Sequence, residues 1–244
     1  MKSICIKYIS IAFLFWIMIG TAGANSEFKP VTDTMLSNPP AENWLGHRGN
    51  LAGWGYSSLN QITTKNVDSL SLVWTSAMEP GRNEVTPLVY DGVLYLLNPN
   101  NIVQAMDARN GDLLWEYRRQ LPEELTLVFG RSMAIYQDKL FMLSGDGYLL
   151  ALDIRTGSVI WETLVDASAL HRGAPIVADG KVFTGRGCGK YKGCFISAHD
   201  ANNGKELWRR SVIALPGEPG NDTWGGFPLA KRNALGVWGA GSYD

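Results

Sequence analysis

Short alternating runs of apolar and polar residues, separated by turn residues, recur along the middle of the chain. One unit predicts four strands, at Ser132–Tyr136, Lys139–Leu143, Tyr148–Asp153 and Val159–Val165. Its turns are rich in Gly and Asp, which suit tight hairpins because Gly accepts a positive φ and Asp bonds its own backbone. PLVYDGVLYLL before this unit and APIVADGKVFTG after it repeat the plan. We therefore expect successive four-stranded antiparallel units.

One motif, Ala-x-Asp-x-x-x-Gly-x-x-x-Trp, occurs once in each unit, as AMDARNGDLLW, ALDIRTGSVIW and AHDANNGKELW. Its aspartates are Asp107, Asp153 and Asp200, and its tryptophans are Trp115, Trp161 and Trp208; both sets are separated by 46 and 47 residues. A period of this length is typical of repeat architectures. We expect the aspartate to begin the turn before the fourth strand and the glycine to be left-handed. The tryptophan should dock on the neighbouring unit, a structural role.

A four-stranded sheet that is apolar on both faces needs a partner on each side. Packing such sheets face to face around an axis buries both faces. The expected fold class is therefore all-β, a β-propeller of four-stranded antiparallel blades with tryptophan-docking motifs. A helical solenoid is the competing repeat fold, but the Asp-Gly turns and the β-branched and aromatic alternation disfavour it.

The three docking motifs resemble those of the pyrroloquinoline quinone (PQQ)-dependent alcohol dehydrogenases, the quinoprotein methanol and ethanol dehydrogenases. NWLGHRGNLAGWGYSSLNQITTKNVDSLSLVW, residues 43–74, and the final VWGAGSYD resemble non-repeated stretches of the same family. The resemblance implies an eight-bladed propeller, of which this chain holds about half. Residues 25–78 would lead into the propeller, and residues 79–244 would form about three blades and the start of another. We expect an N-terminal fragment of a longer enzyme, inactive by itself.

The resemblance also implies a cofactor site. Glu84 and Arg131 match residues that contact the quinone, and Trp238 matches the indole on which its flat ring lies; a guanidinium suits its carboxylates. The candidate cofactor-binding residues are Glu84, Arg131, Arg172, Gly187, Gly189 and Trp238. Each also has an ordinary structural reading: a loop carboxylate for Glu84, a surface cation for Arg131 and blade packing for Trp238. Arg172 stands where the family commonly has threonine, and it could equally face solvent.

The metal site departs from the family pattern. A Gly-Ala-Glu loop supplies a calcium-ligating carboxylate in the family, whereas GRGCGKYKGC, residues 185–194, places Lys190 near that position. A protonated lysine cannot ligate calcium, which takes oxygen ligands. We therefore expect PQQ as cofactor and treat calcium or a lanthanide, used in the family, as doubtful here. The remaining ligands and the catalytic aspartate would follow Asp244.

The first 24 residues read as a secretory signal peptide. Lys2 and Lys7 precede an apolar run at Ile9–Ile19, and Ala22-Gly23-Ala24 supplies the small residues of a cleavage site. This run is shorter than the roughly 20 residues of a membrane span, although an uncleaved anchor stays open. Export to the periplasm would leave Cys188 and Cys194 in an oxidising compartment, where a disulfide is expected and two buried thiols are the alternative.

Composition and charge exclude some function classes. Hydrophobic residues make up 45% of the 244, which argues against disorder. The formal net charge of −1 becomes −3 without Lys2 and Lys7, since 20 basic and 23 acidic residues remain. This balance gives no general case for nucleic acid or an anionic membrane as partner.

The resemblance implies a periplasmic enzyme that oxidises a small alcohol or a similar CH–OH substrate by hydride transfer to the quinone. A cytochrome would accept the electrons. The alternative is a non-catalytic propeller scaffold similar to the outer-membrane assembly lipoprotein, although Asn25, and not a lipid-bearing cysteine, follows Ala24. His47, His171 and His199 lack metal-ligand spacing and are expected to be loop or strand-end residues.

Overall fold

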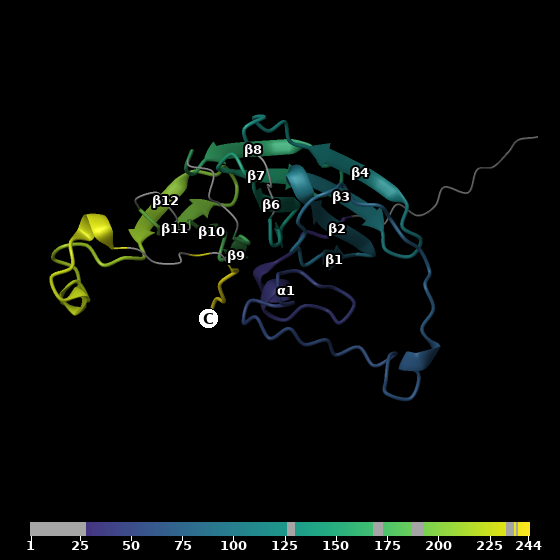
Figure 1. Ribbon diagram of the computed structural model, residues 1–244. Helices are drawn as coiled ribbons and strands as arrows, with labels where there is room; N and C mark the ends of the chain where they lie inside the picture. The colour runs from purple at the N-terminus through teal and green to yellow at the C-terminus, as the bar shows by residue number, and fades with distance from the viewer. Residues whose placement is uncertain (1–27, 126–129, 168–172, 187–192, 233–236, 238) are drawn as a thin grey trace, which may run out of the picture.

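The computed structural model describes residues 28–125, 130–167, 173–186, 193–232, 237 and 239–244. These residues form three four-stranded antiparallel sheets with neighbouring strands in chain order. The blades are β1 (Leu88–Tyr90), β2 (Val93–Asn98), β3 (Ile102–Asp107) and β4 (Leu113–Arg118); β5 (Ala134–Tyr136), β6 (Lys139–Leu143), β7 (Tyr148–Asp153) and β8 (Val159–Leu164); and β9 (Ile176–Ala178), β10 (Lys181–Arg186), β11 (Phe195–Asp200) and β12 (Glu206–Ser211). They lie side by side along an arc, with β4, β8 and β12 on its outer side (Figure 1). The predicted propeller blades are confirmed.

The helices are short. They are α1 (Asp33–Ser37) and four single 3₁₀ turns, η1 (Val67–Ser69), η2 (Pro99–Asn101), η3 (Asp222–Trp224) and η4 (Leu229–Lys231). Thr32 caps α1, because its hydroxyl accepts the Met35 N–H at 3.3 Å. Within the described residues, no helix has both the length and the apolar character needed to cross a bilayer.

The repeated motif builds the turn between the third and fourth strands of every blade. Its aspartate accepts a backbone N–H two residues later: Asp107 from Arg109 at 2.9 Å, Asp153 from Arg155 at 2.9 Å and Asp200 from Asn202 at 2.7 Å. Its glycines, Gly111, Gly157 and Gly204, have φ values of 78°, 72° and 75°. A side chain is strained in this left-handed region, so the recurring glycine follows from the turn geometry.

The tryptophan of one blade lies on the glycine turn of the next. Trp115 Nε1 donates to the Ile154 carbonyl at 3.1 Å, and Trp161 Nε1 donates to the Ala201 carbonyl at 3.3 Å. A Cβ placed on Gly157 would stand only 2.5 Å from Trp115 Cε3. The blades are therefore joined by an indole that both packs and donates a hydrogen bond.

A third tryptophan makes the same contact without belonging to a complete motif. Trp74 Nε1 donates to the Ala108 carbonyl at 3.2 Å, and a Cβ on Gly111 would stand 2.7 Å from the Trp74 ring. At the other end of the arc, Trp208 is 44% exposed. The series of docked indoles thus begins before the first described blade.

Residues 28–53 fasten the inner strands to one another. Val31 pairs with Gln137 beside β5, and Trp44 pairs with Val89 of β1. The Asp33 carboxylate accepts the Tyr136 hydroxyl at 2.9 Å and the Asp179 N–H at 2.8 Å, which links the second blade to the third. This segment lies inside the arc, around α1 (Figure 1). It therefore fixes the relative position of the strand ends that carry the candidate site.

Candidate functional site

The segments that lead into β1 and β5 are hydrogen-bonded to each other. The Thr86 N–H donates to the Arg131 carbonyl at 2.9 Å, and the Ser132 hydroxyl donates to the Thr86 carbonyl at 3.2 Å. Equivalent positions of adjacent blades meet here because each blade repeats the same path. Residues just before an inner strand, which are far apart in the sequence, are thereby brought together.

Two of the predicted cofactor residues meet at this junction. Arg131 forms an ion pair with Glu84, and Arg82 pairs with the same carboxylate. The side chains of Arg131 and Glu84 are 18% and 20% exposed, whereas that of Arg82 is 60% exposed. Partial burial strengthens the inner pair relative to the solvent-screened outer one. Glu84 thus holds the Arg131 guanidinium at the boundary between the first two blades.

A histidine lies beside this pair. His47 Nδ1 is 3.1 Å from the Thr86 hydroxyl, a contact whose donor depends on the tautomer. Burial lowers the pKa of His47, and the charges of Arg48 and Arg131 lower it further. The imidazole is therefore neutral at pH 7, and it adds no positive charge to those of the two guanidinium groups.

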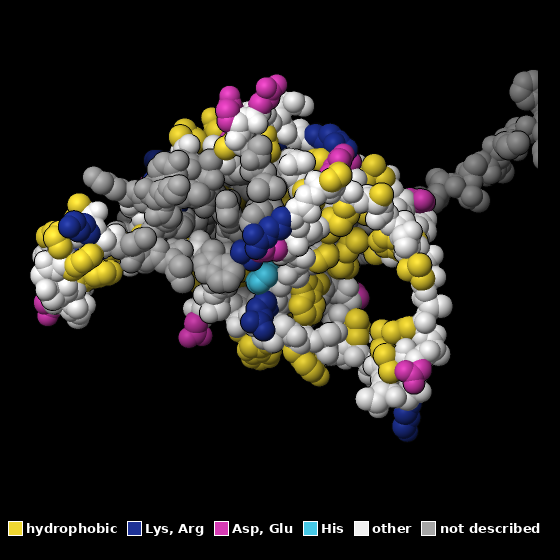
Figure 2. All heavy atoms as spheres, in the orientation of Figure 1, with side chains coloured by type: hydrophobic (Ala, Val, Ile, Leu, Met, Phe, Trp, Pro, Cys, Tyr) yellow, Lys and Arg dark blue, Asp and Glu magenta, His cyan; other side chains and the backbone are white. Residues whose placement is uncertain are grey.

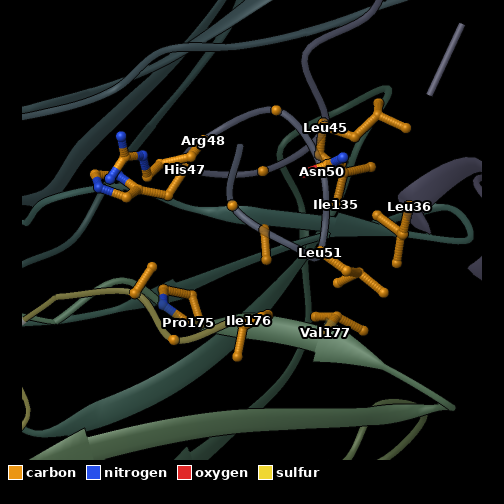
Figure 3. Close-up of a pocket in the computed structure, with 16 residues that line it drawn as sticks. Leu36, Leu45, His47, Arg48, Asn50, Leu51, Ile135, Pro175, Ile176 and Val177 are labelled. Atoms are coloured by element: carbon orange, nitrogen blue, oxygen red, sulfur yellow. The ribbon is translucent and has the colours of Figure 1, made fainter. Parts of the chain in front are cut away.

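A hollow opens next to His47 and Arg48. Figure 3 shows these two side chains together on one side of the hollow, with Pro175, Ile176 and Val177 on another side. Leu36, Leu51 and Ile135 complete much of its apolar lining. The wall is thus contributed by α1, the 45–51 segment, β5 and β9, and it combines apolar side chains with a basic edge.

Several predicted site residues lie outside the described residues: Arg172, Cys188, Lys190, Gly187, Gly189 and Trp238. Their neighbours are described. Val237 packs on Gly185, where an added Cβ would stand 2.5 Å from the Val237 Cβ, and its carbonyl oxygen would be 3.5 Å from a Cβ on Gly173. Cys194 is 1% exposed. The cofactor roles and the disulfide therefore stay predictions.

A buried ion pair that the sequence did not suggest lies at the end of β10. Arg186, at the end of β10, contacts Asp166 at 2.7 Å and the Gly193 carbonyl at 3.2 Å. Its side chain is only 6% exposed. A charge this deeply buried needs such partners, and Arg186 thereby links the end of β10 to Asp166 and to Gly193.

Metal ligands do not gather in the described part of the chain. No group of three or more His, Cys, Asp or Glu side chains lies close enough there to hold an ion. Glu84 is committed to two arginines, which makes it a poor ligand in this arrangement.

Sequence reasoning found Glu84 and Arg131 but gave no role to His47 or Arg48. Both lie in the NWLGHRGN stretch, whose resemblance was noted without assigning a residue. The charge of Arg131 acts on His47, although the two residues are more than 80 positions apart in the sequence. The unusual His-Arg pair within a Gly-rich stretch was the only local signal.

The chain is similar to a known family and to known proteins. The family described as outer membrane protein assembly factor BamB matches residues 57–223. The quinohemoprotein alcohol dehydrogenase ADH-IIG of Pseudomonas putida is 30% identical over 228 residues, which cover 83% of this chain and 31% of that protein. The 1-butanol dehydrogenase (cytochrome c) of Thauera butanivorans is 39% identical over 188 residues, covering 72% and 27%. The chain thus spans about a third of the length of such curated relatives.

Solved structures agree with these relatives. The quinohemoprotein alcohol dehydrogenase ADHIIG from Pseudomonas putida HK5 superposes with a TM-score of 0.77 at 30% identity, over 89% of this chain and 36% of that one. A europium-containing methanol dehydrogenase superposes with a TM-score of 0.70 at 28% identity, over 76% and 34%. The similarity therefore includes the blades and the segment before them.

Proposed function

Because the chain belongs to the family of PQQ-dependent alcohol dehydrogenases, we propose that it supplies part of the cofactor-holding propeller of an enzyme that oxidises an alcohol or a similar CH–OH substrate. The printed names of its relatives, an alcohol dehydrogenase and a 1-butanol dehydrogenase (cytochrome c), support this reaction class. The whole protein carries the reaction, with a cytochrome as the electron acceptor.

The ion pair between Arg131 and Glu84 is the observation that carries this proposal. It places an oriented guanidinium at the junction of two blades, beside the backbone contact between Thr86 and Arg131. A guanidinium has five N–H donors in a rigid fork, so it can hold Glu84 and a further carboxylate or carbonyl together. Arg131 would bind the cofactor, and Glu84 would orient Arg131 and contact the cofactor.

The electron-accepting quinone is the chemistry that PQQ supplies when it is bound, because no protein side chain offers a comparable group. The task of the chain is to bind and orient this planar polyanion and to exclude water from it. Arg172, Gly187, Gly189 and Trp238 remain part of this proposed site. A metal stays doubtful, because Lys190 stands near the family's acidic ligand position.

Cofactor uptake by the full-length protein that contains this chain tests the proposal. The protein is prepared without cofactor and titrated with PQQ in the presence of calcium or a lanthanide, and dye-linked alcohol oxidation is then measured. We expect uptake and activity, and Arg131→Ala should lose both. Arg210→Gln, on the outer strand β12 with 69% exposure, removes the same charge far from the site and should lose neither.

The scaffold alternative makes the opposite prediction for the same titration. A scaffold similar to the outer-membrane assembly lipoprotein would take up no PQQ under any metal condition. That result would overturn the dehydrogenase proposal.

We also propose that residues 1–24 direct export to the periplasm and that Cys188 and Cys194 then form a disulfide. Burial of Cys194 and the oxidising compartment support the pairing. Non-reducing peptide mapping of the exported protein should recover the two cysteines in one linked peptide pair. Recovery of two free thiols, or of a mature N-terminus other than Asn25, would contradict the respective prediction.

A further inference from the structure

Arg48 carries a positive charge that no acidic side chain compensates. Among the described residues, no carboxylate lies within ion-pairing distance of its guanidinium, although thirteen such pairs occur elsewhere. Its guanidinium lies over Gly55, whose Cβ would be 3.4 Å from Nε. Arg48 is exposed, yet its charge is close enough to His47 to lower the pKa of that imidazole. It is therefore available to a ligand at this place.

The surrounding charges are unbalanced in the same direction. Arg82 and Arg131 share the single carboxylate of Glu84, and Arg48 adds a third guanidinium. The group of Arg48, Arg82, Arg131 and Glu84 consequently has a net charge of +2. On the face shown in Figure 2, basic side chains lie on both sides of a histidine ring. An excess of positive charge is relieved when an anion binds to the guanidinium groups.

Burial and the charges of Arg48 and Arg131 lower the pKa of His47, which favours its neutral form. The ring contacts the Thr86 hydroxyl, and the charges of Arg48 and Arg131 both act on it. Protonation would add a third cation to that pair, and a neutral ring can instead contribute a hydrogen bond to a bound group. The arrangement is suited to an acidic ligand with more than one anionic group.

The lining of the adjacent hollow distinguishes an organic anion from an inorganic one. Leu51, Ile135, Pro175 and Ile176 form an apolar wall, and the Arg48 guanidinium and the neutral His47 ring form its polar edge (Figure 3). Inorganic phosphate would gain nothing from the apolar wall. A flat ring system with carboxylates matches both features.

We infer that Arg48 is a second arginine of the cofactor site and that, with Arg131, it binds carboxylate groups of the quinone. This inference rests on the proposed function and adds to it a residue outside the propeller blades. The N-terminal segment then forms part of the ligand site as well as bracing the inner strands. Both guanidinium groups contribute charge-assisted hydrogen bonds, which are stronger than neutral ones.

Equilibrium binding of PQQ to the full-length protein, followed by quenching of tryptophan fluorescence, tests this role without measuring activity. We expect Arg48→Gln to weaken PQQ binding roughly 2- to 5-fold, the range for an exposed ion pair. Arg48→Lys should recover part of the loss, and Arg210→Gln should bind PQQ like the wild type. The trimethyl ester of PQQ lacks the anionic groups, so Arg48→Gln and the wild type should bind it equally.

The outcomes separate this inference from the proposed function. Wild-type binding with an unchanged affinity in Arg48→Gln would overturn the role of Arg48 and leave the dehydrogenase proposal standing. An equal loss for PQQ and for its ester would also overturn it, because the effect would not depend on carboxylates. Failure of the wild type to bind PQQ would overturn both. Circular dichroism of Arg48→Gln, a substitution of an exposed side chain, serves as the folding control.

Discussion

Docking of Trp115 on Gly157 can be tested by a single methyl group. Gly157→Ala would place a Cβ 2.5 Å from Trp115 Cε3 and 2.9 Å from Cζ3, well inside van der Waals contact, at a residue whose φ is 72°. Left-handed backbone costs a non-glycine residue about 1–2 kcal/mol. The ring must also move away, which weakens its packing and its hydrogen bond to the Ile154 carbonyl at 3.1 Å. Displacing the Trp115 ring lowers the free energy of unfolding by roughly a further 2–4 kcal/mol.

Gly92→Ala is the matched control for this change. Gly92 has a φ of 75°, nearly the same as Gly157, and an added Cβ meets nothing within 4 Å. The difference between the two variants therefore isolates the docking contact from the backbone strain. Urea unfolding should give Gly157→Ala a free energy of unfolding roughly 2–4 kcal/mol below that of Gly92→Ala. Its tryptophan emission should also shift to longer wavelength.

Equal destabilisation of the two alanine variants would refute this reasoning. It would mean that the methyl group is accommodated without moving Trp115, and hence that the blades are not held by this contact. A lower free energy of unfolding for Gly157→Ala without any change in tryptophan emission would mean that the substitution acts on the turn alone.

Three further predictions concern the contacts around the blades. Burial lowers the pKa of His199 below its usual 6.5, so its ring is neutral in the native state and the free energy of unfolding should fall as the pH drops below about 6.5. Urea unfolding at pH 7.5 and 5.0 should show a smaller difference in the free energy of unfolding for His199→Leu than for the wild type. An equal difference would contradict this. Trp161→Phe should lower the free energy of unfolding by about 1–2 kcal/mol, since phenylalanine cannot donate to the Ala201 carbonyl; calorimetry showing no change would contradict it. In calorimetry, Arg119→Lys should lower the free energy of unfolding by about 1–3 kcal/mol, because lysine cannot keep the two contacts of 2.9 Å to Asp146 along with a third to Glu162. Unchanged stability would show that one contact suffices.

The sequence predicted the fold because its signal is local and repeated. The motif spacing of 46 and 47 residues fixed the blades, and the expected strands Lys139–Leu143 and Tyr148–Asp153 match β6 and β7 residue for residue. The strand predicted from Ser132 begins instead at Ala134, because Ser132 bonds across to Thr86 of the first blade. That contact is tertiary, and no pattern within the strand reports it.

The candidate site was only partly visible in the sequence. Glu84 and Arg131 could be named from a resemblance, but their mutual ion pair could not, because it depends on how two blades meet. Arg48 and His47 were missed for the same reason. The 45–51 segment that carries them passes inside the arc, and this path brings His47 under the influence of the Arg131 charge. Trp74 was missed because its segment lacks the Ala-x-Asp part of the motif, although it docks like the others.

One part of the motif, its alanine, has a physical reason that emerges only from the pairing of three strands. Ala105, Ala151 and Ala198 each lie between an aromatic residue on the second strand and the motif tryptophan on the fourth. Strands two apart are about 10 Å from each other, yet the ring centroids are 6.1, 5.8 and 6.1 Å apart in the three blades. Both rings must therefore lean over the middle strand, and only a small side chain leaves them room. The register shift directly after each alanine adds local twist. The motif thus encodes the packing within a blade by its alanine and the packing between blades by its glycine.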